Sequence, residues 1–160
     1  MIVSWNNCSK EFAPDGALRD IQVVDADATD WQLVVDFLRS NAADLRYTID
    51  GVPAPLPKDS SSILATRKTA SPTLLFRWSG IEIASHFFGE DDLEFDFRPQ
   101  DVRSQRELEL LASFVTCIGR LLHKSVVVYH EGWEMSPFLL YDHESDDVRY
   151  VPPTPNQGVQ

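Results

Sequence analysis

The sequence predicts an α+β fold, in which two main helices pack on one face of a twisted antiparallel sheet of about five or six strands. Three observations predict it. Residues 73–98 alternate between apolar and polar side chains, as strands with one buried face do. Residues 104–123 carry a broad apolar stripe at helical spacing, and residues 30–41 carry a narrower stripe of the same kind.

The region 73–98 is interpreted as a β-meander with two tight turns. Ser79-Gly80 fits a two-residue hairpin, and Gly89 to Asp92 closes a second one. The strand after the second turn alternates between its two faces, with Leu93, Phe95 and Phe97 on one and Glu94, Asp96 and Arg98 on the other. We therefore expect one buried sheet face, and a second face or an edge that is polar and acidic.

Both helices begin with capping signals. Thr29 followed by Gln32 fits a capping box for the helix at 30–41, and Ser104 followed by Glu107 fits one for the helix at 104–123. The apolar stripe of the second helix is wide enough to press against the sheet over much of the helix circumference.

Further strands are expected at 21–24 and, after the second helix, at 126–129, 138–141 and 148–151. Three prolines at positions 152, 153 and 155 then stop the fold. The length of 160 residues suits one domain, which we place at 1–152, with a flexible C-terminal tail at 153–160. The Pro-rich segment 52–72 is the least regular part, and the sequence assigns it no role.

Composition limits the classes of function. The net charge of −11 repels nucleic acid and anionic membranes and attracts basic partners. No apolar run approaches the roughly 20 residues that span a bilayer, and no secretory leader is visible at the N-terminus. Two cysteines provide neither a disulfide framework nor a zinc-binding spacing. A cytoplasmic protein without nucleic-acid or membrane partners is expected.

No catalytic motif is present. The chain lacks a Walker loop, a Gly-rich dinucleotide fingerprint, a nucleophile elbow and a zinc-protease motif. We therefore predict no catalytic residues, no metal site and no cofactor. The alternative is a small enzyme whose site combines His86 and His130 with nearby acids, because an imidazole beside a carboxylate supports acid–base or metal chemistry.

Acidic and aromatic residues in turns are the candidate partner-binding site. Residues 81–100 hold six acids and one arginine, and residues 131–148 hold six acids and no lysine or arginine. Tryptophan and methionine between acids favour a protein interface, because both side chains are enriched there. The predicted partner-binding residues are Glu90, Asp91, Asp92, Glu131, Trp133, Glu134 and Asp142.

A small acidic α+β chain of this kind resembles the bacterial immunity proteins of polymorphic and contact-dependent toxin systems. The resemblance rests on the block from Leu93 to Tyr129, in which a strand, a capped helix and a second strand follow one another. It implies that an acidic surface docks on a basic toxin domain and neutralises it. We expect a monomer or homodimer. An acidic adaptor subunit of a larger complex is a further alternative.

Overall fold

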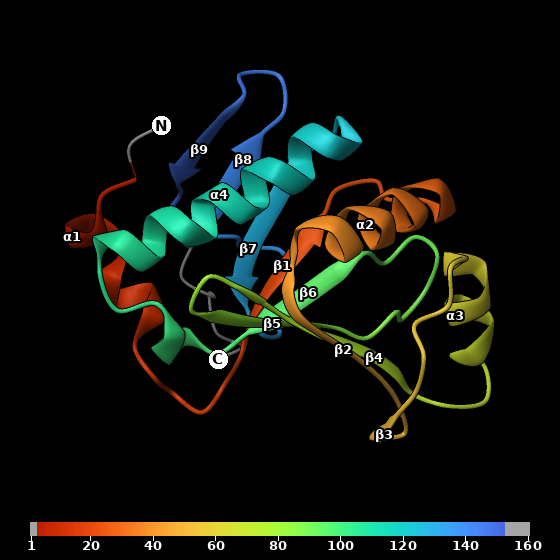
Figure 1. Cartoon of the computed structure of the whole chain (residues 1–160). Coiled ribbons are helices and arrows are strands. Elements are labelled where there is room, and N and C mark those ends of the chain that lie inside the picture. The colour runs from red at the N-terminus through yellow and green to blue at the C-terminus, as the bar shows by residue number, and fades with distance from the viewer. Residues whose placement is uncertain (1–2, 153–160) are drawn as a thin grey trace, which may run out of the picture.

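Nine strands form one antiparallel sheet in the computed structural model, which describes residues 3–152 (Figure 1). The strand order is β3-β2-β4-β5-β6-β1-β7-β8-β9, so that the first strand lies in the middle of the sheet. The strands are β1 (Arg19–Val23), β2 (Ala43–Ile49), β3 (Val52–Pro53), β4 (Pro72–Trp78), β5 (Ile81–Ser85), β6 (Glu94–Phe97), β7 (Val126–His130), β8 (Leu139–Asp142) and β9 (Asp147–Tyr150).

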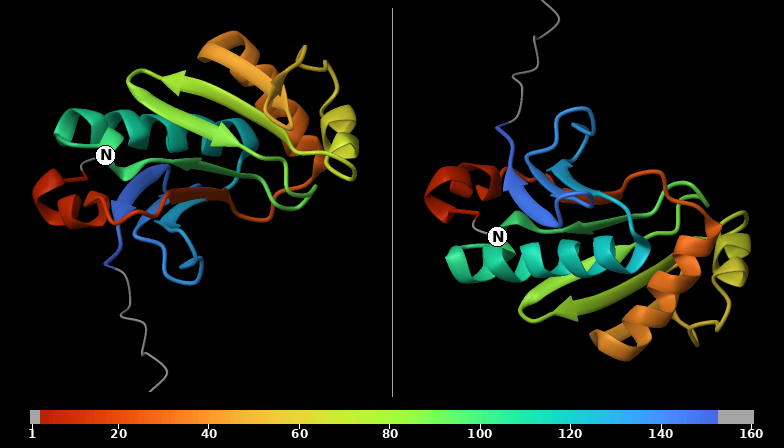
Figure 2. Two further views of the ribbon diagram at one scale, coloured as in Figure 1. Left: turned by 90° about the horizontal axis from the view of Figure 1, so that it is seen from below. Right: turned by 90° about the horizontal axis from the view of Figure 1, so that it is seen from above.

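Four α-helices accompany the sheet within the described residues: α1 (Trp5–Cys8), α2 (Ala28–Asn41), α3 (Ser60–Thr66) and α4 (Gln105–Leu122). Two short 3₁₀ turns, Ser9–Phe12 and Pro99–Asp101, complete the structure. Figure 2 shows α1 at one end of the molecule and α3 at the other, with α2 and α4 between them.

The expected size of the fold is therefore wrong. The structure is α+β, but it has nine strands rather than five or six, and four α-helices rather than two. The strand number was too low because β2 and β3 extend the sheet beyond β4, while β8 and β9 continue the same sheet beyond β7. The predicted tail at 153–160 lies outside the described residues.

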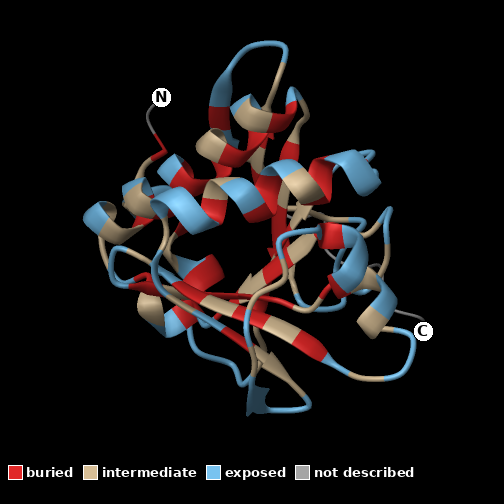
Figure 3. Ribbon diagram, turned by 45° about the vertical axis from the view of Figure 1, so that its right-hand side comes forward, coloured by how far each residue is buried: buried red, intermediate tan, exposed pale blue. Residues whose placement is uncertain are grey.

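The longer helices, α2 and α4, pack against the same face of the sheet. The Phe114 ring on α4 makes edge contacts with Phe95 of β6 and Trp78 of β4, and Phe37 on α2 stacks on Trp78 from the other side. The outward surface of α4 is exposed (Figure 3). This face of the sheet is consequently the hydrophobic core.

The start of α2 differs from the prediction. Its N-cap is Asp27 rather than Thr29, and Asp30 completes the capping box with hydrogen bonds in both directions. Asp30 also accepts a hydrogen bond from the Lys124 ammonium group, which ties α2 to the loop that follows α4. Ser104 does cap α4, as expected, and it contacts Glu107 through its side chain.

The N-terminal segment is held by buried polar contacts. Glu11 is 5% exposed, and its carboxylate lies 2.6 Å from His130 Nε2 and accepts a hydrogen bond from the Tyr150 hydroxyl. Arg19, also buried, donates from Nε to the Glu11 carbonyl oxygen. These contacts tie the segment to β1, β7 and β9.

The Pro-rich segment contains two regular elements, β3 and α3. The Gln32 side chain of α2 accepts a hydrogen bond from the Ser60 N–H at 2.7 Å and donates to the Lys58 carbonyl oxygen at 2.9 Å. Ile63 of α3 is fully buried. The segment 52–72 is therefore attached to α2 at a fixed position.

Candidate functional site

The three central strands, β6, β1 and β7, present a row of acidic and polar side chains on the face turned away from α2 and α4. The pairing register fixes this arrangement: Asp20 lies between Asp96 and Tyr129, and Gln22 lies between Glu94 and Val127. Because alternate residues share a face, these six residues form two adjacent rows across the middle of the sheet. We call them the open face.

The carboxylates on the open face are crowded and partly buried. Burial and the negative charges of nearby carboxylates, the first of them Asp96, raise the pKa of Asp20 to about 7. Burial and a hydrogen bond with Asp92 raise the pKa of Glu94 to about 8. Near neutral pH, these groups therefore bind protons that exposed carboxylates would have lost.

Among the described residues, no lysine or arginine side chain neutralises the carboxylates of Asp20 and Glu94. None of the outward side chains of β6, β1 and β7 is a lysine or arginine, and no ion pair joins Asp20 or Glu94 to a described residue. The arginines of β2 and β4 are engaged elsewhere, since Arg46 and Arg77 both contact Glu82, and Arg98, just after β6, pairs with Asp101. Asp96 contacts the imidazole of His86 at 2.8 Å.

The two acidic segments predicted from the sequence lie side by side at one rim of the open face. Asp92, Glu131 and Glu134 are all near enough to Asp20 to contribute to its raised pKa. A depression of about 640 Å³ lies at this rim, and Asp91 and Glu134 both line it, together with Gln22 and the apolar Val24 and Val127. The rim thus joins carboxylates to apolar surface.

The remaining predicted residues lie elsewhere. Glu90 faces a different cavity, next to α3. Asp142 is at the opposite end of β8, where it holds the turn to β9 by accepting hydrogen bonds from Glu144 and Ser145. Trp133 lies in the same loop as Glu131 and Glu134, 42% exposed, and its ring contacts His130. Its neighbour Met135 is 94% exposed.

Asp20, the most central residue of the site, was not among the predicted site residues. The strand was expected at 21–24, whereas β1 begins at Arg19. The alternation from Arg19 to Val23 contains the signal, because it places Asp20 and Gln22 on the face opposite Ile21. Glu94 and Asp96 were assigned to a polar face, but no pattern in the sequence shows that β1 pairs between β6 and β7.

The alternative enzyme site does not assemble around both histidines. His86 points to the open face, where it contacts Asp96, whereas His130 shares the covered face with Arg19, its partner in the β1–β7 register. Residues 3–152 contain no group of three or more His, Cys, Asp or Glu side chains arranged to hold a metal ion. A site that uses both imidazoles is therefore incompatible with the sheet.

None of the helices within residues 3–152 combines the length and the apolar character that crossing a membrane requires. No family model, curated protein or solved structure matches the chain. The resemblance to immunity proteins stays a prediction, and function has to be argued from the open face itself.

Proposed function

We propose that the protein is a binding protein that docks its open face on a basic protein partner, and that the partner is a toxin domain which this docking neutralises. The observation that supports the proposal is the group of half-buried carboxylates on β6 and β1, with which no lysine or arginine of the described residues forms an ion pair. The toxin as partner rests on the resemblance of the sequence to immunity proteins.

The charge on the open face favours a basic partner in two ways. An acidic surface attracts a basic one over long range and so accelerates the encounter. In the complex, lysine or arginine side chains of the partner would lie next to Asp20 and Glu94 and would lower the pKa values of these two carboxylates. Binding near neutral pH should therefore release protons.

The rim offers an apolar anchor beside this charge. Trp133 and Met135 expose large side chains next to Glu131 and Glu134, and Val24 is also exposed. Aromatic and methionine side chains in such positions commonly contribute most of the affinity of an interface. The carboxylates would set the rate and orientation of docking, and the exposed apolar residues its lifetime.

The test is co-expression of the chain with the polypeptide encoded by the adjacent gene, in cells that this polypeptide alone kills. We expect the wild-type chain to restore growth and to form a stable complex with the polypeptide. An Asp20→Lys/Glu94→Lys variant should fail to do either, because it reverses two charges at the centre of the open face.

A Glu144→Lys variant is the matched control, because Glu144 is an exposed acid on the β8–β9 turn, away from the rim. It should protect as well as the wild type. Protection by the Asp20→Lys/Glu94→Lys variant would refute docking through the open face. A complex that forms without any protection would instead favour an adaptor subunit.

A further inference from the structure

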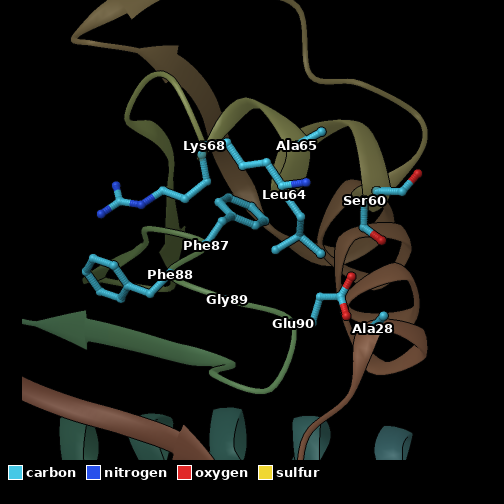
Figure 4. A pocket seen from close by; sticks show the side chains of 11 residues that line it. Ala28, Ser60, Leu64, Ala65, Lys68, Phe87, Phe88, Gly89 and Glu90 are labelled. Atoms are coloured by element: carbon cyan, nitrogen blue, oxygen red, sulfur yellow. The ribbon is translucent and has the colours of Figure 1, made fainter.

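A second site lies outside the open face, in a cavity of about 550 Å³ between α3, the first turn of α2 and the loop 86–90 (Figure 4). Its lining is largely apolar and includes Leu64 and Ala65 of α3 and both phenylalanines of the loop, Phe87 and Phe88. A cavity of this volume is within the range that accommodates small organic ligands.

The walls of the cavity are held in place by the core. Trp31 of α2 stacks on Phe87 with ring centroids 4.7 Å apart, and its indole N–H donates to the Gly89 carbonyl oxygen at 2.9 Å. Phe87 is buried, with a positive φ of 55°. A bulky residue rarely adopts this left-handed conformation, which here directs Phe87 inward while its neighbour Phe88 stays 46% exposed.

Two cations lie at one end of the cavity. Neither Arg67 nor Lys68 forms an ion pair with a described carboxylate, although the chain carries a net charge of −11. The Arg67 guanidinium carbon lies 4.9 Å from the centroid of the exposed Phe88 ring. An acid, Glu90, lies at the other end beside Ala28 (Figure 4).

We propose that this cavity binds a small molecule with an apolar, aromatic body and a single anionic group such as a carboxylate or sulfonate. The body would lie on Leu64, Phe87 and Phe88, and the anion would pair with Arg67 and Lys68. Glu90 would repel an anion at its own end and so fix the direction in which the ligand binds. This site is independent of the open face and of the proposed toxin partner.

The probe for the test is 8-anilinonaphthalene-1-sulfonate, which has an aromatic body and one negative charge. Fluorescence titration of the full chain should show saturable binding of one probe molecule per chain. An Arg67→Gln/Lys68→Gln variant should weaken binding by roughly tenfold or more, because it removes both positive charges that would pair with the sulfonate. The neutral analogue N-phenyl-1-naphthylamine should bind the wild type and this variant equally.

Two further variants locate the probe. Leu64→Trp enlarges a side chain that points into the cavity and should abolish binding while the protein still unfolds cooperatively (Figure 4). Lys58→Gln, which removes an exposed cation that does not line the cavity, should leave binding unchanged.

The proposal is overturned if the probe does not bind at millimolar concentration, or if binding is insensitive to both Leu64→Trp and the loss of Arg67 and Lys68. Inorganic phosphate that competes as well as an aromatic carboxylate would show a simple anion site and would also contradict it. An Asp20→Asn variant, altered on the open face, should bind the probe like the wild type.

Discussion

The two faces of the central strands are made from alternate residues of the same short segments, yet they are in opposite energetic situations. On the covered face, Ile21, Phe95 and Val128 are buried under the helices. On the open face, Asp20, Glu94 and Asp96 repel one another across the same strands. The covered face stabilises the fold, whereas the charges on the open face oppose it.

Folding requires the apolar residues of the covered face, but it does not explain the carboxylates of the open face. A half-buried carboxylate with a raised pKa destabilises the folded state when it is ionised. The fold would be more stable with neutral residues on the open face, so folding alone does not account for them. Binding of a cationic partner, as we propose, would account for them.

The largest effect is expected at the centre of the covered face. Phe114→Ala removes a fully buried ring that contacts Phe76, Phe95 and Trp78. The free energy of unfolding should fall by ~3–5 kcal/mol, as is usual when a large core aromatic is truncated. Urea denaturation measures it, and an unchanged midpoint would show that α4 does not cover the core.

The next effect tests how closely α4 approaches β8. A Cβ atom added at Gly119 would lie 2.2 Å from the Tyr141 ring, which is itself buried. Gly119→Ala should therefore destabilise the protein by ~1–3 kcal/mol through overpacking, although alanine favours a helix. Gly80→Ala is the control, because a Cβ there meets nothing within 4 Å. Thermal denaturation measures the stability of both variants. Equal melting temperatures for Gly119→Ala and Gly80→Ala would contradict this close packing.

On the open face, neutral substitutions should stabilise the protein, whereas the two substitutions above destabilise it. In the folded state Asp20 and Glu94 have pKa values of about 7 and 8, above their ordinary values of 3.8 and 4.5. Between pH ~4 and ~8 the folded state therefore binds more protons than the unfolded state, so the free energy of unfolding falls as pH rises through this window.

In an Asp20→Asn/Glu94→Gln variant, the free energy of unfolding should decrease much less as pH rises. It should match the wild type near pH 4 and exceed it by ~1–2 kcal/mol at pH 8.5, a gain limited by solvent screening of partly exposed groups. Urea midpoints from pH 4 to 9 measure it. A variant less stable than the wild type at pH 8.5 would show that these carboxylates support the fold.

The smallest effect on stability is expected at the rim. Trp133→Ala removes a half-exposed ring that rests on His130 and should lower the free energy of unfolding by only about 0.5 kcal/mol, as surface substitutions commonly do. The same variant should dissociate faster from its partner, because a buried anchor governs the dissociation rate. A stability loss of several kcal/mol would assign Trp133 to the core instead.

The sequence predicted the local features of this fold better than its assembly. The helical stripe and Ser104 cap of α4, and the alternation in β4, β5 and β6, depend on neighbouring residues and were readable. The place of β1 was not, because it pairs with strands far along the chain. That pairing brings Asp20 beside Asp96, so the centre of the candidate site depends on the part of the fold that local patterns do not encode. The cavity beside α3 depends on the same kind of long-range contact, between Trp31 and the loop 86–90.

If the open face binds a basic partner, the charges of Asp20 and Glu94 should set the association rate constant with the polypeptide encoded by the adjacent gene. Surface plasmon resonance at low ionic strength and at pH 9, where Asp20 and Glu94 are ionised in the folded state, should show roughly tenfold slower association for Asp20→Asn/Glu94→Gln, because electrostatic steering weakens. A control variant, Asp59→Asn/Glu144→Gln, loses the same charge from exposed acids elsewhere and should associate nearly as fast as the wild type. Equal association rates for the wild type and both variants, at low and at high salt, would contradict the account.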